Sequence, residues 1–251
     1  MDCKPDFERR KRPDRLHRTP ARLDFLQSAT GLILALFIAG HLIFEATILY
    51  GKDAMYAMTR FFEGYYFFGE PYPVIVSVLA LGVFIVFIAH ALIAMRKFPS
   101  DYRQYKVMKE HVQRFGHGDT SLWMLQIWTG FAMFFLGSVH LYMMMSAPGD
   151  IGPFASADRI VSGWMWPLYV MLIISVVIHA AVGSYRLCLK WGWFEGKNSR
   201  KSRLVLRRIT YAVLSAYMVL SFVSLGTYIA IGIEHSDRVG ERYHPSGEVQ
   251  P

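Results

Sequence analysis

The sequence predicts an all-α integral membrane protein, built as a bundle of five transmembrane helices. The chain of 251 residues is 53% hydrophobic and has a mean hydropathy of +0.27, which is more apolar than soluble domains usually are. Its apolar residues gather in five long runs, and its charged residues gather between them. The runs lack the alternation of membrane β-strands, so helices are expected.

Each of the five runs can cross about 30 Å of hydrocarbon, which takes roughly 20 helical residues. The expected spans are residues 24–50, 74–95, 121–145, 166–189 and 206–233. The chain therefore divides into a basic N-terminal arm at 1–22, a membrane domain at 23–233 and a tail at 234–251.

Basic residues alternate between the two sides of the predicted bundle. Of the 27 Lys and Arg residues, 22 lie in the N-terminal arm, the second loop and the fourth loop, and 5 lie in the other flanks. Because basic flanks stay in the cytoplasm, we expect a cytoplasmic N-terminus and a periplasmic C-terminus. The net charge of +8 therefore reflects topology, and no nucleic-acid recognition motif accompanies it, so no nucleic-acid partner is expected. The two cysteines form no CxxC, so this chain alone holds no iron–sulfur cluster.

Each of the first four spans contains one histidine, whereas the fifth contains none. A buried imidazole in hydrocarbon needs a hydrogen bond or a ligand, and a hydrogen-bonded core residue is the ordinary alternative for any single one. The four intramembrane histidines are His41, His90, His140 and His179. The occurrence of one histidine in each helix favours a role as metal ligands.

Two of these histidines are expected at an outer level of the membrane. His41 lies 19 residues beyond Arg22, and His140 lies 21 residues beyond Asp119. At about 1.5 Å per residue, both are roughly 30 Å from the inner boundary.

The other two histidines are expected at an inner level. His90 lies six residues before Arg96, and His179 lies seven residues before Arg186, so both are about 10 Å from that boundary. Two bis-histidine sites, one above the other, would satisfy all four rings.

Two histidines alone coordinate zinc poorly, but haem iron needs only two axial ligands because the porphyrin supplies four nitrogens. The sequence therefore predicts that the first four helices enclose two stacked b haems. Small residues that would admit a porphyrin lie near the histidines, among them Gly40, Gly137 and Gly183; helix packing is the alternative reason for them. The chain has no nucleotide fingerprint or cysteine cluster, so we expect a redox partner on another subunit, docked on the basic inner face.

Several strings resemble the di-haem cytochrome b membrane-anchor subunit of bacterial quinol:fumarate reductase, of the succinate:quinone oxidoreductase family. They include "QSATGLILALFIAGHL", "FIAHALIAMRKFP", "TGFAMFFLGSVHLYMM" and "YRLCLKWGWFEG". The resemblance implies a bacterial inner-membrane subunit that oxidises menaquinol. It also implies an iron–sulfur subunit on the cytoplasmic face and a flavoprotein with FAD that reduces fumarate; a dimer of this heterotrimer is left open.

The resemblance also implies roles for particular residues. His41 and His140 would ligate the distal haem, and His90 and His179 the proximal one. The proximal propionates would be held by Gln27, Ser28, Trp123 and Lys190. The distal propionates would lie near Arg159. Interfacial anchoring is the ordinary alternative for the last three.

Two acidic residues are candidates for taking protons from the quinol. By the resemblance, Glu63 matches the acid at the outer menaquinol site, with a solvated loop acid as the alternative. Glu45 lies one helical turn after His41, so we expect it near the distal haem or the quinol, unless it reaches the outer surface. Some members of the family that this chain resembles carry a Glu two residues before the inner histidine of the fourth helix, for a transmembrane proton path. This chain has Val177 there, which cannot carry protons.

Other functions remain open at this point. The same architecture serves succinate dehydrogenases that reduce menaquinone, and the sequence does not fix the direction or the haem potentials. A cytochrome b anchor of a hydrogenase or formate dehydrogenase would distribute its ligands unevenly among helices. A proton-coupled transporter would show broken helices and midplane charge pairs, and only Glu45 fits that pattern.

Overall fold

The computed structural model describes residues 18–99, 101–115 and 118–245, and the regular secondary structure within them is all helical, with no strand. Most of the predicted basic arm and the last six residues of the tail lie outside these ranges. Five helices are long and apolar enough to cross a membrane, which confirms the predicted fold class. They are α1 (Thr19–Glu45, extended by η1, Ala46–Tyr50), α4 (Val74–Met95), α6 (Gly118–Ser146), α8 (Trp166–Trp191) and α9 (Ser199–Glu234).

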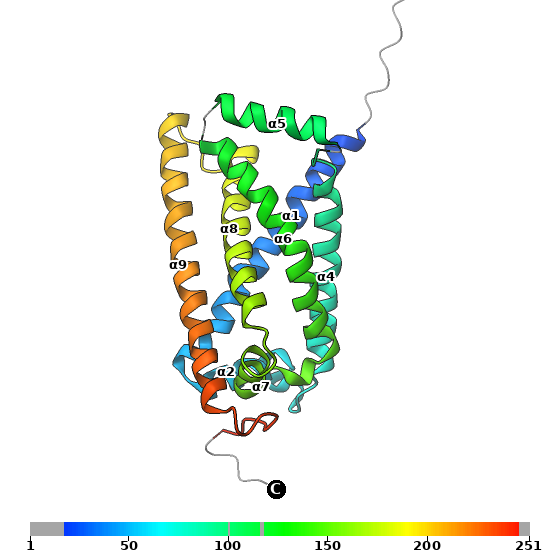
Figure 1. The fold of residues 1–251 in the computed structure, drawn as a ribbon, viewed down its shortest axis with the longest axis vertical. Coiled ribbons are helices and arrows are strands. Elements are labelled where there is room, and N and C mark those ends of the chain that lie inside the picture. The colour runs from blue at the N-terminus through cyan, green and yellow to red at the C-terminus, as the bar shows by residue number, and fades with distance from the viewer. Residues whose placement is uncertain (1–17, 100, 116–117, 246–251) are drawn as a thin grey trace, which may run out of the picture.

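Short helices cover the two ends of the bundle (Figure 1). One lies across the end that carries Arg96, Lys97 and Lys190, which we call the basic end. The others lie at the opposite end with the C-terminal residues, which we call the tail end. In chain order they are α2 (Lys52–Phe62), α3 (Tyr65–Phe68), α5 (Tyr102–Phe115, at the basic end), η2 (Pro148–Asp150) and α7 (Pro153–Ile160).

Local sequence signals explain where several helices begin and end. Prolines stand in the first turn of α1, α7 and α8, where a missing N–H costs nothing. Gly192 ends α8 in the left-handed conformation, with φ of 67°. Asn198 caps α9 by accepting a hydrogen bond from the Lys201 N–H at 3.0 Å. These signals fix the basic end of the last two spans.

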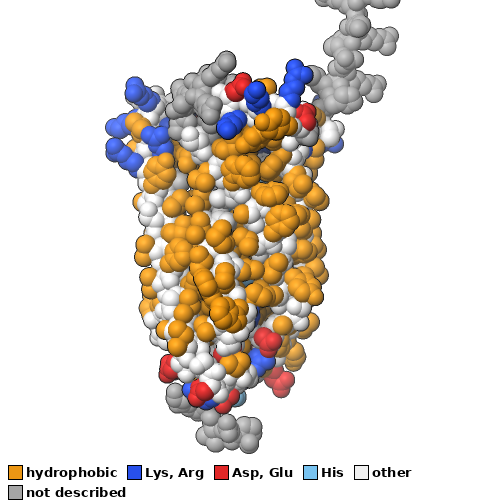
Figure 2. Space-filling model, viewed as in Figure 1, with side chains coloured by type: hydrophobic (Ala, Val, Ile, Leu, Met, Phe, Trp, Pro, Cys, Tyr) orange, Lys and Arg blue, Asp and Glu red, His pale blue; other side chains and the backbone are white. Residues whose placement is uncertain are grey.

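The packing of the helices brings the four histidine-bearing spans together. α6 packs against α4 and α8, α1 packs against α4 and α8, and α9 lies outside them against α8, α7 and η1. Large apolar side chains cover the outer surface between the two charged ends (Figure 2). A buried cluster ties α9 to the tail end, formed by Ile48, Met55, Ala157, Ile160, Leu225, Tyr228 and Ile231. The bundle therefore presents apolar side chains to lipid, as a multi-pass membrane protein must.

The tail end is closed by a buried polar pair. His235, at the end of α9, is 1% exposed, and its Nδ1 lies 3.0 Å from Asp158 Oδ1 on α7. The second Asp158 oxygen accepts the Gly240 N–H at 3.0 Å, and Phe154 stacks on the imidazole with ring centroids 4.1 Å apart. The residues after α9 are thereby held against α7.

Candidate functional site

The structure brings the four intramembrane histidines together as two pairs. The ring centroids of His41 and His140 lie 6.1 Å apart, and those of His90 and His179 lie 6.5 Å apart. Two imidazoles on opposite sides of one metal, with metal–nitrogen bonds of about 2 Å, would have centroids about 6.3 Å apart. Both pairs therefore have the spacing of axial ligands to a single ion. Among the described residues no group of three or more His, Cys, Asp and Glu side chains gathers, so an ion between either pair needs further donors such as porphyrin nitrogens.

The inner pair is held in the tautomer that a metal ligand needs. The Thr30 hydroxyl donates to the Leu26 carbonyl at 2.8 Å, so its oxygen is free to accept from His90 Nδ1 at 3.0 Å. The Gln27 backbone lies beside the same ring. With the proton fixed on Nδ1, Nε2 keeps its lone pair for a metal.

His179 on α8 is held in the same way by α6. Its Nδ1 donates to the Gln126 carbonyl at 3.0 Å and lies 3.4 Å from Thr129 Oγ1, while the Thr129 hydroxyl donates to the Leu125 carbonyl at 2.8 Å. Both inner histidines thus have an oriented ring and an unprotonated Nε2.

Two glycines make room for these rings. A Cβ on Gly31 would lie 3.0 Å from His90 Cε1, and a Cβ on Gly130 would lie 2.8 Å from His179 Cε1. The glycines singled out from sequence behave differently: Gly40 and Gly137 face phenylalanine rings, and Gly183 faces the Gln126 amide. Gly31 and Gly130, which make room for the inner imidazoles, were not predicted, because they lie on other helices than the histidines that they contact.

A sequence repeat underlies this arrangement and was also missed. In α1, Leu, Gln, Thr, Gly and His occur at 26, 27, 30, 31 and 41, and in α6 they recur at 125, 126, 129, 130 and 140. In each helix the first four support an inner histidine on a neighbouring helix, and the fifth is an outer histidine. The pattern L-Q-x-x-T-G-x9-H is present in the sequence, but its two copies lie 99 residues apart, far beyond the period of solenoid repeats.

The outer pair has an aromatic setting. Phe37 stacks on His41 with centroids 5.5 Å apart, and the edge of Tyr169 meets His140 at 5.7 Å. His140 Nδ1 is buried without a hydrogen-bond partner. Arg159, on α7, reaches the Tyr169 hydroxyl at 3.5 Å and the Met144 sulfur at 3.7 Å, so its charge lies beside this pair.

Glu45 contacts the fifth span. Its Oε2 accepts a hydrogen bond from the Tyr228 hydroxyl at 3.2 Å, and Tyr228 is only 4% exposed. The carboxylate lies one turn beyond His41 at the end of α1 and is partly buried. The sequence did not indicate that α9, which lacks a histidine, would supply its partner.

Glu63 is buried, with 4% of its surface exposed, and it pairs with Arg60. The Arg60 Nη1 to Glu63 Oε2 distance is 2.8 Å, and Arg60 Nη2 donates to the Tyr56 hydroxyl at 2.7 Å. Burial lowers the pKa of the Arg60 guanidinium, but its contacts with Tyr56 and Glu63 outweigh burial and raise that pKa above the ordinary value. Glu63 is therefore a paired, sheltered carboxylate rather than a solvated loop acid.

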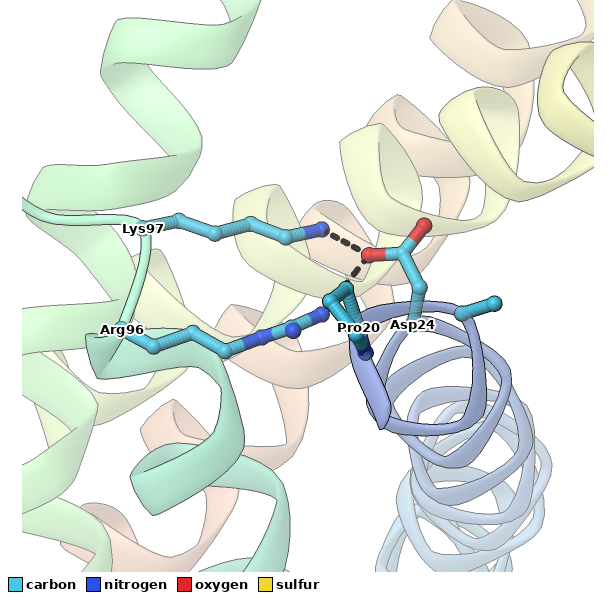
Figure 3. A pocket seen from close by; sticks show the side chains of 5 residues that line it. Pro20, Asp24, Arg96 and Lys97 are labelled. Atoms are coloured by element: carbon cyan, nitrogen blue, oxygen red, sulfur yellow. Dashed lines mark hydrogen bonds and ion pairs between the residues drawn. The ribbon is translucent and has the colours of Figure 1, made fainter. Parts of the chain in front are cut away.

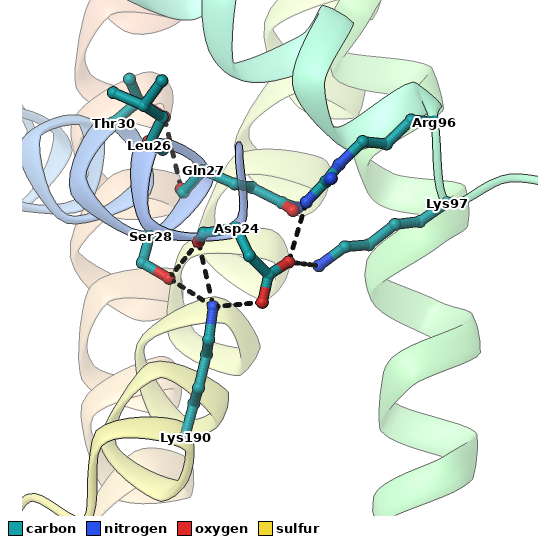
Figure 4. A network of polar contacts seen from close by, with 8 residues as sticks. All are labelled: Asp24, Leu26, Gln27, Ser28, Thr30, Arg96, Lys97 and Lys190. Carbon is teal, nitrogen blue, oxygen red and sulfur yellow. Dashed lines mark hydrogen bonds and ion pairs between the residues drawn. The ribbon is translucent and has the colours of Figure 1, made fainter. Parts of the chain in front are cut away.

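Three of the four predicted proximal propionate residues gather at the basic end of α1 and α8 (Figure 4). Lys190 Nζ donates to Ser28 Oγ at 2.9 Å and pairs with Asp24 Oδ2 at 2.8 Å. Gln27 Oε1 is buried and has no hydrogen-bond partner. Trp123 lies on α6, a different helix, and Val177 is 3% exposed in the interior of α8. The Lys190 ammonium and the Gln27 side-chain N–H can donate hydrogen bonds to an anion-bearing ligand at this level.

Known proteins match this chain closely. The fumarate reductase cytochrome b subunit of Wolinella succinogenes is 51% identical over 220 residues, which are 88% of this chain and 86% of that protein. The subunits of the same name from Helicobacter pylori strains J99 and 26695 are 48% and 47% identical over 217 residues, 86% of this chain and 84% of each relative. This chain belongs to the family of fumarate reductase cytochrome b subunits. A family model, the succinate dehydrogenase/fumarate reductase transmembrane subunit, also matches residues 102–225.

Membership in the fumarate reductase cytochrome b family confirms the predicted resemblance. A cytochrome b subunit carries haem, and the fumarate reductase complex pairs such a membrane anchor with flavoprotein and iron–sulfur subunits. The histidine pairs fit that cofactor by spacing, tautomer and the room left by Gly31 and Gly130.

Proposed function

We propose that this subunit oxidises menaquinol near the tail end and delivers the electrons to an iron–sulfur subunit docked on the basic end, for fumarate reduction on a flavoprotein. The observation that carries the proposal is the pair of bis-imidazole sites at two depths, His41 with His140 and His90 with His179. By the distribution of basic residues, the basic end is cytoplasmic and the tail end periplasmic.

The histidines would hold two haems b, one at each level. When bound, these groups supply one-electron transfer along the membrane normal. The two histidines at each level would hold the group, and Thr30, Gln126 and Thr129 would keep the inner rings oriented toward it.

The quinol's protons would pass to Glu63. A proton acceptor must be ionised before the reaction, and the 2.8 Å ion pair with Arg60 holds this carboxylate in a sheltered position. Glu45 is a second acceptor near the outer histidines, with Tyr228 orienting its carboxylate.

A redox-difference spectrum of the purified heterotrimer tests the proposal. Reduction by a menaquinol analogue should yield two b-type components with separate midpoint potentials. Replacing one outer histidine, as in His140→Ala, should remove one component, and His179→Ala the other. A colourless complex would contradict the proposal. So would a b-type component that survives the replacement of each of the four histidines in turn.

The role of Glu63 has a matched control in the same loop. Glu63→Gln should lower menaquinol oxidation by about 10²-fold, the usual scale for losing a general base, with both spectral components retained. Glu70→Gln removes an exposed acid seven residues away and should change nothing. Comparing fumarate reduction with succinate oxidation in the same preparation decides the physiological direction.

A further inference from the structure

The two ends of the bundle differ in what their charged side chains contact. At the basic end, Arg96 and Lys97 reach Asp24 beside a shallow pocket, and these contacts join two transmembrane helices (Figure 3). At the tail end, the segment that follows α9 contacts the short helices α2 and α7, which lie beside it in Figure 1. We call residues 235–243 the tail strap.

Polar contacts hold the tail strap at both of its ends. Asp158 on α7 holds its first half, as described above. In its second half, Arg242 Nη2 lies 2.6 Å from Asp150 Oδ1 on η2, and the Tyr243 hydroxyl donates to Asp53 Oδ1 on α2 at 2.6 Å. Burial and the bond to Asp53 raise the pKa of Tyr243 to about 12, so the hydroxyl stays a donor. The tail strap therefore joins α9 to α7, η2 and α2.

The Tyr243 ring contacts one aromatic ring of α7 and one of α2. Its centroid lies 5.1 Å from that of Phe154, with an interplanar angle of 86°. The distance to the Tyr56 centroid is 5.9 Å, with an angle of 63°. Edge-to-face pairs at such distances attract each other. Tyr243 thus fixes α2 in two ways, through the Asp53 carboxylate and through the Tyr56 ring.

Tyr56 connects the tail strap to Glu63. Its hydroxyl accepts a hydrogen bond from Arg60 Nη2 at 2.7 Å, and the Arg60 guanidinium carbon lies 4.8 Å from the centroid of its ring. The other arm of the guanidinium, Nη1, lies 2.8 Å from Glu63 Oε2. Because a guanidinium is planar and rigid, the place of the Tyr56 side chain helps determine where Arg60 meets the carboxylate.

The connections of α2 make such support necessary. Gly51, with φ of 117°, precedes α2, and Gly64, with φ of 80°, follows Glu63. Glycines adopt many backbone conformations, so they do not by themselves fix the direction of the helix between them. The orientation of α2 therefore depends on side-chain contacts. Met55 in the buried cluster supplies one of them, and Tyr243 supplies others.

We propose that the tail strap positions Glu63 for the quinol, with Tyr243 acting through Tyr56 and Arg60. This role depends on the function proposed for Glu63 above. Tyr243 is then a positioning residue rather than a catalytic one. A misplacement of about 1 Å at the reacting groups can slow an enzyme by about 10²-fold, so a support outside the site can control the rate.

The experiment measures steady-state menaquinol oxidation by the purified heterotrimer, with a menaquinol analogue as donor and fumarate as acceptor. Tyr243→Ala should lower kcat about tenfold and leave KM for the quinol within about twofold, because proton transfer and not binding is impaired. Tyr243→Phe keeps the ring and loses only the bond to Asp53, so it should lose less. Val239→Ala, which shortens a strap side chain that is 54% exposed, is the matched control and should keep full activity.

A double-mutant cycle separates positioning from general damage. In a Glu63→Gln background, Tyr243→Ala should cause no further loss, because the carboxylate that it positions is already gone. Fumarate reduction driven by a reduced viologen, which bypasses the quinol, should stay at the wild-type rate, and both b-type components should be retained. Losses that multiply in the double variant would overturn the proposal, and so would an equal fall in viologen-driven reduction.

Failure of the Glu63 function would give a different result. Full activity in Glu63→Gln would refute the role proposed for that carboxylate. A slow Glu63→Gln beside a fully active Tyr243→Ala would refute the role of the tail strap alone. If Tyr243→Ala does not assemble, Tyr243→Phe passes through the same cycle and is judged by the same outcomes.

Discussion

Tyr228 on α9 donates a hydrogen bond to Glu45 on α1, across 183 positions of sequence and at a distance of 3.2 Å. This contact connects the span without a histidine to the outer histidine pair. It gives an ionisable residue near the tail end a fixed, buried partner, and it leads to the first of four predictions.

Glu45→Gln should slow menaquinol oxidation at least about tenfold, because an amide cannot take the proton that a carboxylate takes. Tyr228→Phe should have a smaller effect in the same direction, since it removes only the hydrogen bond. Steady-state quinol oxidation and the redox-difference spectrum should be measured together. Full activity in Glu45→Gln would remove this residue from the mechanism.

Gly130→Ala should impair the inner site. Its Cβ would lie 2.8 Å from His179 Cε1, too close for a real contact, so the imidazole must move away from its hydrogen bond to the Gln126 carbonyl. We expect loss of one b-type component in the absorbance spectrum. Gly82→Ala, in the neighbouring transmembrane helix α4, is the control, because no atom lies within 4 Å of a Cβ at that position. Equal spectra for the two variants would contradict the requirement for glycine at position 130.

Thr30→Val removes the hydroxyl that fixes the His90 tautomer. Loss of such an outer contact usually weakens metal binding by about 10–100-fold, so the inner haem should dissociate more readily on dilution or on competition with apomyoglobin. Thr210→Val removes a hydroxyl that bonds only its own helix, at the Leu206 carbonyl, and should retain both haems. An inner haem as tightly held in Thr30→Val as in Thr210→Val would count against the contact.

Asp158→Ala should loosen the tail end. It removes a buried hydrogen bond to His235 and a part-buried one from the Gly240 N–H, and it leaves both ring nitrogens of the buried His235 without a hydrogen bond. The cost should be about 2–4 kcal/mol of unfolding free energy, seen as a lower thermal midpoint and faster proteolysis after α9. Asp237→Ala removes an acid whose side chain is 80% exposed and should be neutral. A thermal midpoint that matches the wild type would refute the prediction.

The sequence was sufficient for the spans and for the levels of the histidines. Helix length, apolar runs and the constant rise per residue determine both, and they do not depend on packing. His41 with His140 and His90 with His179 could therefore be matched by depth alone. The family resemblance pointed to Glu63, but its burial and its ion pair with Arg60 became visible only in the folded chain.

Contacts between distant helices could not be predicted in the same way. Asp24 collects cations from α4 and α8, and Glu45 finds Tyr228 on α9, because helix rotation and crossing bring those faces together. Spacing along one helix carries no information on these rotations. The Thr–Gly supports are the exception, since their repetition 99 residues apart was readable before any fold was known.

That repetition makes the bundle pseudo-symmetric. α1 and α6 run in the same direction and are equivalent, each carrying one outer histidine, while α4 and α8 run the other way and each carry one inner histidine (Figure 1). A twofold axis along the membrane normal would exchange the partners within each pair. A porphyrin turned over by a half rotation about that axis would meet the same imidazoles, so the four histidines alone do not determine its orientation. Only side chains that break the equivalence, such as Asp24 opposite Trp123, can distinguish the two ways of inserting the cofactor.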